Sequence, residues 1–243
     1  MFSIRYAPET DSTNDDAAPL LGEPGSEGLV VLADFQRAGK GRRARTWIAP
    51  PGSSLLFTAI LPRPIHTSAL WAIPFWTALA VADGIEASGA RVSLQWPNDL
   101  LLDGRKCGGI LCISRVAGEQ AWVGCGVGLN VARPAPSSDL AALDPPPAFL
   151  SDRTPQIRRG ALLTAILAAF ARRLDELEHP GGVARAWETR AVLRGTTYCI
   201  LVDGESEPFE ATALRLTNDG GLVVDAGGAE RTISLADARV LRD

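Results

Sequence analysis

The chain has 243 residues, enough for one large domain, or for one large and one small domain, with a substantial core. Its composition, 46% apolar and 21% charged residues, is typical of a soluble globular protein. The net charge of −4 gives no overall attraction to nucleic acids or anionic membranes, so a nucleic-acid function would require a local basic patch.

The cysteines, the histidines and the N-terminus exclude other classes. The four cysteines stand at positions 107, 112, 125 and 199, and the two histidines at 66 and 179. They form no CxxC pair and no zinc-ligand spacing, so we expect no metal site and no disulfide framework. The first eight residues lack a basic segment followed by an apolar one, so no signal peptide is predicted. The weakly charged stretch 65–82 contains polar residues and Pro74, and we expect a buried helix there rather than a membrane span. The protein should be cytoplasmic.

In chain order, short apolar runs predict strands at 28–33, 53–61, 92–96, 108–114 and 121–131. Between the second and third runs, 70–87 predicts a helix with Pro74 in its first turn or at a kink. Asp103-Gly104 predicts a turn that folds the segments on either side of it into a hairpin.

The second half begins with a proline-rich connection over 132–155. Apolar residues then recur every three or four positions from Leu162 to Leu177, which predicts an amphipathic helix that ends at 179–182. Beyond it, glycine-containing turns separate short strand candidates at 196–202, 209–216, 222–224 and 230–234. This pattern predicts a compact β-barrel appended to a mixed α/β domain, with the boundary near Arg194.

A basic loop runs from Gln36 to Trp47. Five basic residues fall within nine positions and are interleaved with glycines: Arg37, Lys40, Arg42, Arg43 and Arg45. Guanidinium groups suit phosphate or carboxylate, and glycines let backbone N–H groups close around an anion. Trp47 offers a surface on which a base can stack.

Familiar phosphate loops do not fit this segment. A Walker A loop would need glycine at Asp34 and Ser or Thr at Gly41. A Rossmann fingerprint would need a helix where Pro50-Pro51-Gly52 stands, and an acidic residue downstream, yet none occurs between Phe35 and Ala82. A nucleic-acid patch and an ordinary solvated loop both remain open from charge alone.

Three further motifs contain polar residues or a run of glycines. Gln95-Trp-Pro-Asn-Asp99 ends a strand and Lys106-Cys-Gly-Gly-Ile-Leu111 follows, so the hairpin turn brings Asn98, Asp99 and Lys106 toward one end. Asp11-Ser-Thr-Asn14 precedes a short acidic segment and is also typical of helix capping. The glycine-rich run 124–130 indicates close approach of a backbone or a ligand, and Asn130 ends it.

Together and in this order, these motifs resemble the biotin–protein ligase family. They are Ser12-Thr13-Asn14, the loop from Gln36 to Trp47, Trp96 to Asp99, Lys106 to Leu111, and Gly128-Leu-Asn130, so the resemblance spans essentially the whole chain. Two positions depart from the family pattern. Lys40 replaces an arginine and loses its bidentate fork, and Ala44 replaces a glycine, which stiffens the loop or alters its path.

The resemblance implies an α+β fold: a class II synthetase-like catalytic domain with a mixed β-sheet and helices at 1–194, and a small SH3-like β-barrel at 195–243. It implies a ligase that joins biotin to ATP as biotinyl-5′-AMP, with Mg²⁺, and transfers biotin to a lysine of a biotin carboxyl carrier protein. Only eleven residues precede Ser12, too few for a helix-turn-helix, so we expect no DNA-binding repressor activity. The resemblance leaves a monomer or a homodimer open and implies no nucleic-acid or membrane partner.

It also assigns site residues. Lys106 contacts the biotin carboxylate and the reacting phosphate, Arg42 closes over the adenylate, and Asp99 helps to deprotonate or position the carrier lysine. Trp47 packs on adenine. Biotin's ring is bound or shaped by Ser12, Thr13, Asn14 and Gln36, and the remaining binding positions are Gly39, Lys40, Gly41, Arg43, Asn98, Gly109 and Asn130.

Two rival functions remain. Lipoate or octanoate transferases share the catalytic fold, and those that form an acyl-enzyme need a cysteine, for which Cys107 is the candidate. A non-catalytic nucleic-acid-binding protein would use the basic loop and bind in a salt-sensitive way.

Overall fold

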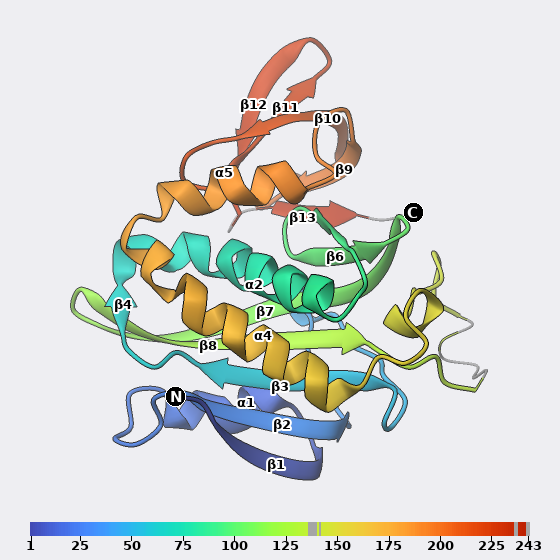
Figure 1. The fold of residues 1–243 in the computed structure, drawn as a ribbon. Coiled ribbons are helices and arrows are strands. Elements are labelled where there is room, and N and C mark those ends of the chain that lie inside the picture. Colours follow the sequence, from blue (N-terminus) through green and yellow to red (C-terminus); the bar gives the residue numbers. More distant parts are fainter. Residues whose placement is uncertain (136–139, 141, 236–237, 242–243) are drawn as a thin grey trace.

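A computed structural model describes residues 1–135, 140, 142–235 and 238–241 (Figure 1). Part of the predicted connection over 132–155 therefore lies outside the described residues. The main sheet has the strand order β1-β2-β3-β8-β7-β6-β5, with β4 paired to β8. Its strands are β1 Ser3–Thr10, β2 Leu29–Gln36, β3 Ser54–Ile60, β4 Ile65–His66, β5 Ser93–Gln95, β6 Asp99–Leu102, β7 Arg105–Ala117 and β8 Gln120–Asn130. Since β1 and β2 run parallel and the other pairs antiparallel, the predicted mixed sheet is confirmed.

Helices cover the sheet on both faces. On one face α2 Ile73–Ala87 packs against α4 Arg159–Arg173, and α5 Gly181–Arg190 lies beyond them toward the top of Figure 1. The short α1 Thr13–Ala17 contacts β2 and β3. Among the described residues, 3-10 helices also occur at Ala18–Leu20, Arg42–Ala44, Thr67–Ala72, Leu150–Asp152 and Leu174–Glu178.

The predicted helix over 70–87 is α2, extended by the 3-10 turn before it. Pro74 stands in its first turn, where the missing N–H removes no helix hydrogen bond. The stretch Thr67–Ala87 has the length and apolarity of a membrane span, yet 72% of its most apolar window is buried inside the protein. It is the core helix that the sequence predicted.

The C-terminal strands form a second, antiparallel sheet with the order β12-β11-β10-β9-β13. They are β9 Thr197–Val202, β10 Phe209–Leu216, β11 Leu222–Ala226, β12 Ala229–Ile233 and β13 Ala238–Leu241. One continuous hydrophobic core contains residues of both sheets, such as Leu94 of β5 and Tyr198 of β9, together with Trp96, which directly follows β5. Trp96 and Tyr198 meet edge to face with ring centroids 6.5 Å apart. The small sheet is thus packed onto the main one.

Several elements were not predicted, among them the short strands β4 and β6. The sequence of β1 shows little alternation of apolar and polar residues and contains Pro8. An edge strand tolerates proline because its outer N–H groups need no partner. Helix α5 begins with Gly181-Gly182, residues of low helix propensity that conceal it. Strand β13 was also missed. The hairpin turn at Asp103-Gly104 is confirmed, and both residues have positive φ (51° and 75°), as this tight turn requires.

Candidate active site

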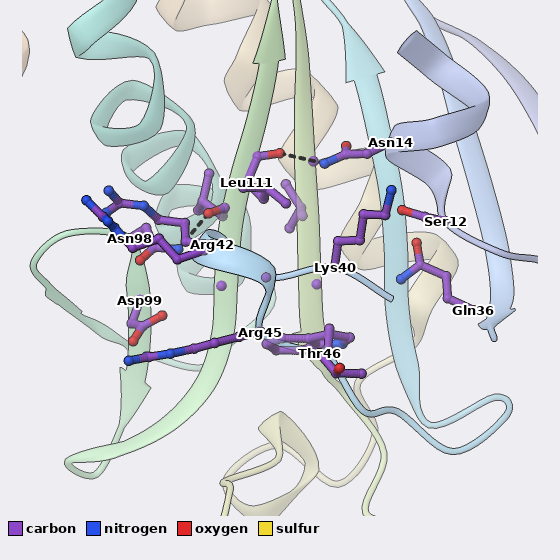
Figure 2. Close-up of a pocket in the computed structure, with 18 of the residues that line it drawn as sticks. Ser12, Asn14, Gln36, Lys40, Arg42, Arg45, Thr46, Asn98, Asp99 and Leu111 are labelled. Atoms are coloured by element: carbon purple, nitrogen blue, oxygen red, sulfur yellow. Dashed lines mark hydrogen bonds between the residues drawn. The ribbon is translucent and has the colours of Figure 1, made fainter. Parts of the chain in front are cut away.

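A cavity of about 150 Å³ opens between α1, the basic loop and the β6–β7–β8 strands (Figure 2). It joins residues from all the motifs that the sequence singled out. Its lining comprises Ser12, Thr13, Asn14, Gln36, Lys40, Gly41, Arg42, Arg43, Arg45, Thr46, Trp47, Pro97, Asn98, Asp99, Lys106, Gly109, Ile110, Leu111, Gly126, Val127 and Gly128. Of the predicted site residues, only Gly39 and Asn130 lie outside this lining.

One end of the cavity is a polar network. The backbone N–H and the hydroxyl of Thr13 both donate to Gln36 Oε1, at 2.8 and 3.1 Å. Asn14 donates to the Leu111 carbonyl (3.0 Å) and accepts from the buried Thr58 hydroxyl (2.7 Å). Ser12 occupies the N-cap position of α1, but its hydroxyl makes no capping bond. Ser12 is only 2% exposed, and helix capping, the ordinary structural role of a serine at this position, does not account for its hydroxyl.

The glycines of β8 form the floor of the cavity. A β-carbon at Gly126 would collide with the Asn14 amide and the Leu111 carbonyl, and one at Gly128 would lie 2.7 Å from the Trp47 ring. The predicted close approach of a backbone is found at Gly126, from the Leu111 carbonyl, whereas at Gly128 the neighbour is the Trp47 side chain. Trp47 Nε1 is buried and has no acceptor among the described residues, which leaves a donor for a ligand.

The basic loop closes on itself as a narrow hairpin. The Trp47 N–H donates to the Gly39 carbonyl (2.8 Å), and the Gly41 N–H donates to the Arg45 carbonyl (2.7 Å). In this conformation the Gly41 N–H is therefore used within the loop. Gly39 allows a close approach within the loop, because a β-carbon there would lie 2.6 Å from the Trp47 carbonyl oxygen.

The loop cations are held by other parts of the chain. Lys40 pairs with Asp15 of α1 at 2.6 Å. Arg42 donates to the Leu235 carbonyl (2.6 Å), and Arg43 forms a two-pronged pair with Asp203 (2.6 and 2.9 Å). Burial, together with the charges of Arg43 and Arg45, lowers the pKa of Arg42. Figure 2 shows the Arg45 side chain directed toward Asp99. The loop cations thus have partners within the protein, although the Lys40 side chain remains 52% exposed.

Lys106 and Asp99 form the ionic centre of the site. Lys106 Nζ lies 2.8 Å from Asp99 Oδ1, and the Asp99 side chain is only 4% exposed. Burial, with the nearby charge of Arg45, lowers the pKa of Lys106 to about 8. Its ammonium also lies 5.6 Å from the Trp47 ring centroid. A cation with a lowered pKa beside a buried carboxylate suits the binding and activation of an anionic group.

Asn98 and Asn130 have structural partners. Asn98 Nδ2 donates to the Ile110 carbonyl (2.7 Å), which fixes the start of β6 against β7. Asn130 Nδ2 donates to the Ala148 carbonyl (3.2 Å). Asn130 lines a second cavity of about 190 Å³, which shares Thr46, Trp47 and Lys106 with the first. Trp47 and Lys106 therefore stand between two adjoining cavities.

Cys107 cannot serve as a nucleophile in this fold. It is fully buried, its thiol donates to the Leu100 carbonyl (3.4 Å), and burial raises its pKa to about 12. A reactive cysteine requires an accessible thiolate, so the acyl-enzyme rival loses its candidate.

The sequence reasoning missed several residues of the site. Arg45 stands in the basic loop and was noted only as part of its charge, while Pro97, Thr46 and Leu111 lie within recognised motifs without a role assigned. Thr58 is buried in an apolar strand, and a lone threonine there gives no local signal of its bond to Asn14.

Comparisons with known proteins agree with this geometry. The family model of the Biotin/lipoate A/B protein ligase family matches residues 6–130. A biotin–[acetyl-CoA-carboxylase] ligase of Paracoccus denitrificans is 37% identical over 197 residues, covering 76% of this chain and 80% of that protein. The bifunctional ligase/repressor BirA of Bacillus spizizenii is 28% identical over 236 residues, covering 96% of this chain and 72% of that protein. The structure of biotin protein ligase from Aquifex aeolicus in complex with biotin and ATP has a TM-score of 0.79 at 20% identity, covering 100% of both chains.

Proposed function

Because the chain belongs to the biotin/lipoate A/B protein ligase family, we propose that it is a biotin protein ligase. It activates biotin with ATP to biotinyl-5′-AMP and transfers the biotinyl group to a lysine of a carboxylase carrier protein. The observation that carries this function is the convergence of five separate motifs on one cavity around Lys106. The acyl-enzyme chemistry of the lipoate and octanoate branch is disfavoured by the buried Cys107.

The first step brings two anions together. The biotin carboxylate attacks the α-phosphate of ATP, and pyrophosphate leaves. Lys106 binds the carboxylate and the reacting phosphate, and Arg42 stabilises the charge that develops on the phosphoryl oxygens. Their positions in the cavity lining support these roles.

Biotin's polar ring occupies the network end of the cavity, where Ser12, Thr13 and Gln36 bind it and Asn14 shapes the wall. Ser12, Thr13 and Asn14 are buried and Thr13 is bonded to Gln36, which supports the assignment, because a mostly apolar ligand with one polar ring needs a few fixed hydrogen-bond partners. Adenine packs on Trp47, with Asn98 and Gly109 on the first cavity's side and Asn130 on the second's.

In the second step the carrier lysine attacks the adenylate. This amine has an ordinary pKa near 10.4 and must lose its proton, for which Asp99 is the nearest carboxylate in the cavity lining. The basic loop, with Gly39, Lys40, Gly41 and Arg43, covers the acyl-adenylate and excludes water, which would hydrolyse it.

Finer features follow from the family. Mg²⁺ would enter with ATP and offset the charge of the phosphates, and Asp99 is the one carboxylate in the lining of the described cavity that could help to hold it. The small sheet is an SH3-like barrel, with the domain boundary near residue 194. We place the enzyme in the cytoplasm, as a monomer or homodimer, with a biotin carboxyl carrier protein as its partner.

Calorimetric titration of the purified protein tests the proposal. We expect biotin to bind, and addition of MgATP to give heat of turnover with release of pyrophosphate. A carrier protein should then gain biotin on one lysine. Binding of lipoate or octanoate in place of biotin would move the protein to the other branch, and no response to any of them would reject the enzyme.

A further inference from the structure

The basic loop is anchored to the small C-terminal sheet at two neighbouring residues. Both guanidinium nitrogens of Arg43 donate to the Asp203 carboxylate, at 2.6 and 2.9 Å, and the adjacent Arg42 donates to the Leu235 carbonyl at 2.6 Å. Asp203 follows β9 and Leu235 follows β12, so both anchors lie at turns of the small sheet. Residues separated by 160 and 193 positions in the chain thus meet over the cavity.

The anchored part of the loop has an unfavourable backbone. Arg43 has φ 54° and ψ 48°, and Ala44 has φ 59°, so two consecutive residues with β-carbons occupy the left-handed region. In that region the β-carbon crowds the following carbonyl oxygen, and such conformations persist only where surrounding contacts hold them. The loop therefore depends on its anchors more than a relaxed loop would.

Charge within the loop adds to this dependence. Arg42, Arg43 and Arg45 lie close enough for the second and third to disfavour the charge on the first. In this structure Arg43 meets the Asp203 carboxylate at 2.6 Å. The Arg43 side chain is 21% exposed, which strengthens the pair relative to a fully solvated one.

We propose that Asp203 is a positioning residue for adenylate formation: through its two-pronged pair with Arg43 it holds the basic loop over the cavity before substrates bind. The anchoring of the loop by Asp203 rests on the observed contacts alone. Its effect on adenylate formation rests on the proposed function. Apparent affinity falls in proportion to the fraction of molecules in the binding-competent conformation. Asp203 therefore lowers the KM for ATP and biotin and retains the adenylate, without touching either substrate.

The test compares Asp203→Asn with Glu205→Gln. The asparagine keeps the size of the side chain and removes its charge. Glu205 is a matched control, since it lies two residues away, pairs with Arg231 at 2.6 Å within the small sheet, and lines neither cavity. Asp203→Glu restores the charge and should recover most of the wild-type behaviour.

Limited trypsin digestion without substrates gives a readout independent of activity. Trypsin cleaves after Lys40, Arg42, Arg43 and Arg45 once the loop opens. For loss of a partly exposed two-pronged pair we expect cleavage within 40–45 to accelerate roughly three- to tenfold in Asp203→Asn, and not in Glu205→Gln. Raising the salt concentration to about 1 M should bring the wild type toward the variant, because salt screens the pair.

The catalytic readout is the split between KM and kcat for pyrophosphate release. Asp203→Asn should raise the KM for ATP and the rate of biotinyl-adenylate release roughly three- to tenfold, with kcat changed by less than about twofold. Cleavage and adenylate release equal to those of Glu205→Gln would overturn the proposal, as would slower cleavage in Asp203→Asn. Digestion needs no substrate. If the protein failed to bind biotin, the proposed function would be refuted, but the digestion would still show whether Asp203 holds the loop.

Discussion

Biotin affinity should fall as the pH rises through about 8, because Lys106 then loses its charge. Burial lowers the pKa of this lysine to about 8, well below the ordinary value, so the loss comes near pH 8 rather than above 10. About 90% of the side chains are charged at pH 7 and about 10% at pH 9. If the carboxylate binds only the ammonium form, the Kd for biotin rises about tenfold between these pH values.

Calorimetric titration with biotin alone, from pH 6.5 to 9.5, measures this effect. Omitting ATP removes the titration of its phosphates, and the biotin carboxylate stays ionised throughout. Lys106→Arg is the control, since a guanidinium keeps its charge and its Kd should not change with pH. Asp99→Asn removes the carboxylate 2.8 Å from Lys106 Nζ, so its profile should shift to lower pH. A constant Kd in the wild type, or the same rise in Lys106→Arg, would refute the reasoning.

Further predictions concern the same cavity. Lys106→Ala should nearly abolish adenylate formation in a pyrophosphate-release assay; a variant with most of its activity would remove Lys106 from the site. Arg42→Gly should release biotinyl-adenylate and label bystander lysines, and unchanged release would argue against its covering role. Cys107→Ser should keep its adenylation and transfer activity, whereas an inactive, folded variant would revive the acyl-enzyme mechanism. Gly126→Ala should weaken biotin binding by about 1–3 kcal/mol, since the new methyl displaces the Asn14 amide; an unchanged Kd would show that the strand yields without cost.

The local part of the site could be predicted from the sequence. Asn98, Asp99 and Lys106 are separated by one tight turn, so the hairpin alone brings them together. The glycines of β8 indicated that other groups lie close to this strand, because glycine weakens a strand interior and is often found where another group approaches closely. The family resemblance then joined the distant motifs, which no periodicity in the sequence connects.

Long-range partners were not predictable in the same way. Asp203 stands in an ordinary Asp-Gly turn, and nothing near it in the sequence indicates Arg43 as its partner. Gly41 is a second example: nothing in the sequence indicated that its N–H donates to the Arg45 carbonyl in the loop hairpin. The destination of a backbone N–H is decided by the tertiary path of the chain, which residue type alone does not specify.

The shared hydrophobic core limits how freely this protein can be divided. Residue 194 separates two sheets, but Tyr198 and Leu222 belong to the same core as Trp96 and Phe75. A chain cut there would remove the Tyr198 ring that packs against Trp96, and the apolar surface exposed in this way would favour aggregation. Exchanging the small sheet with that of a relative would likewise require its matching surface on the main sheet. Substitutions on the contacting surfaces of the two parts therefore have to match. The parts form one folding unit rather than two interchangeable modules.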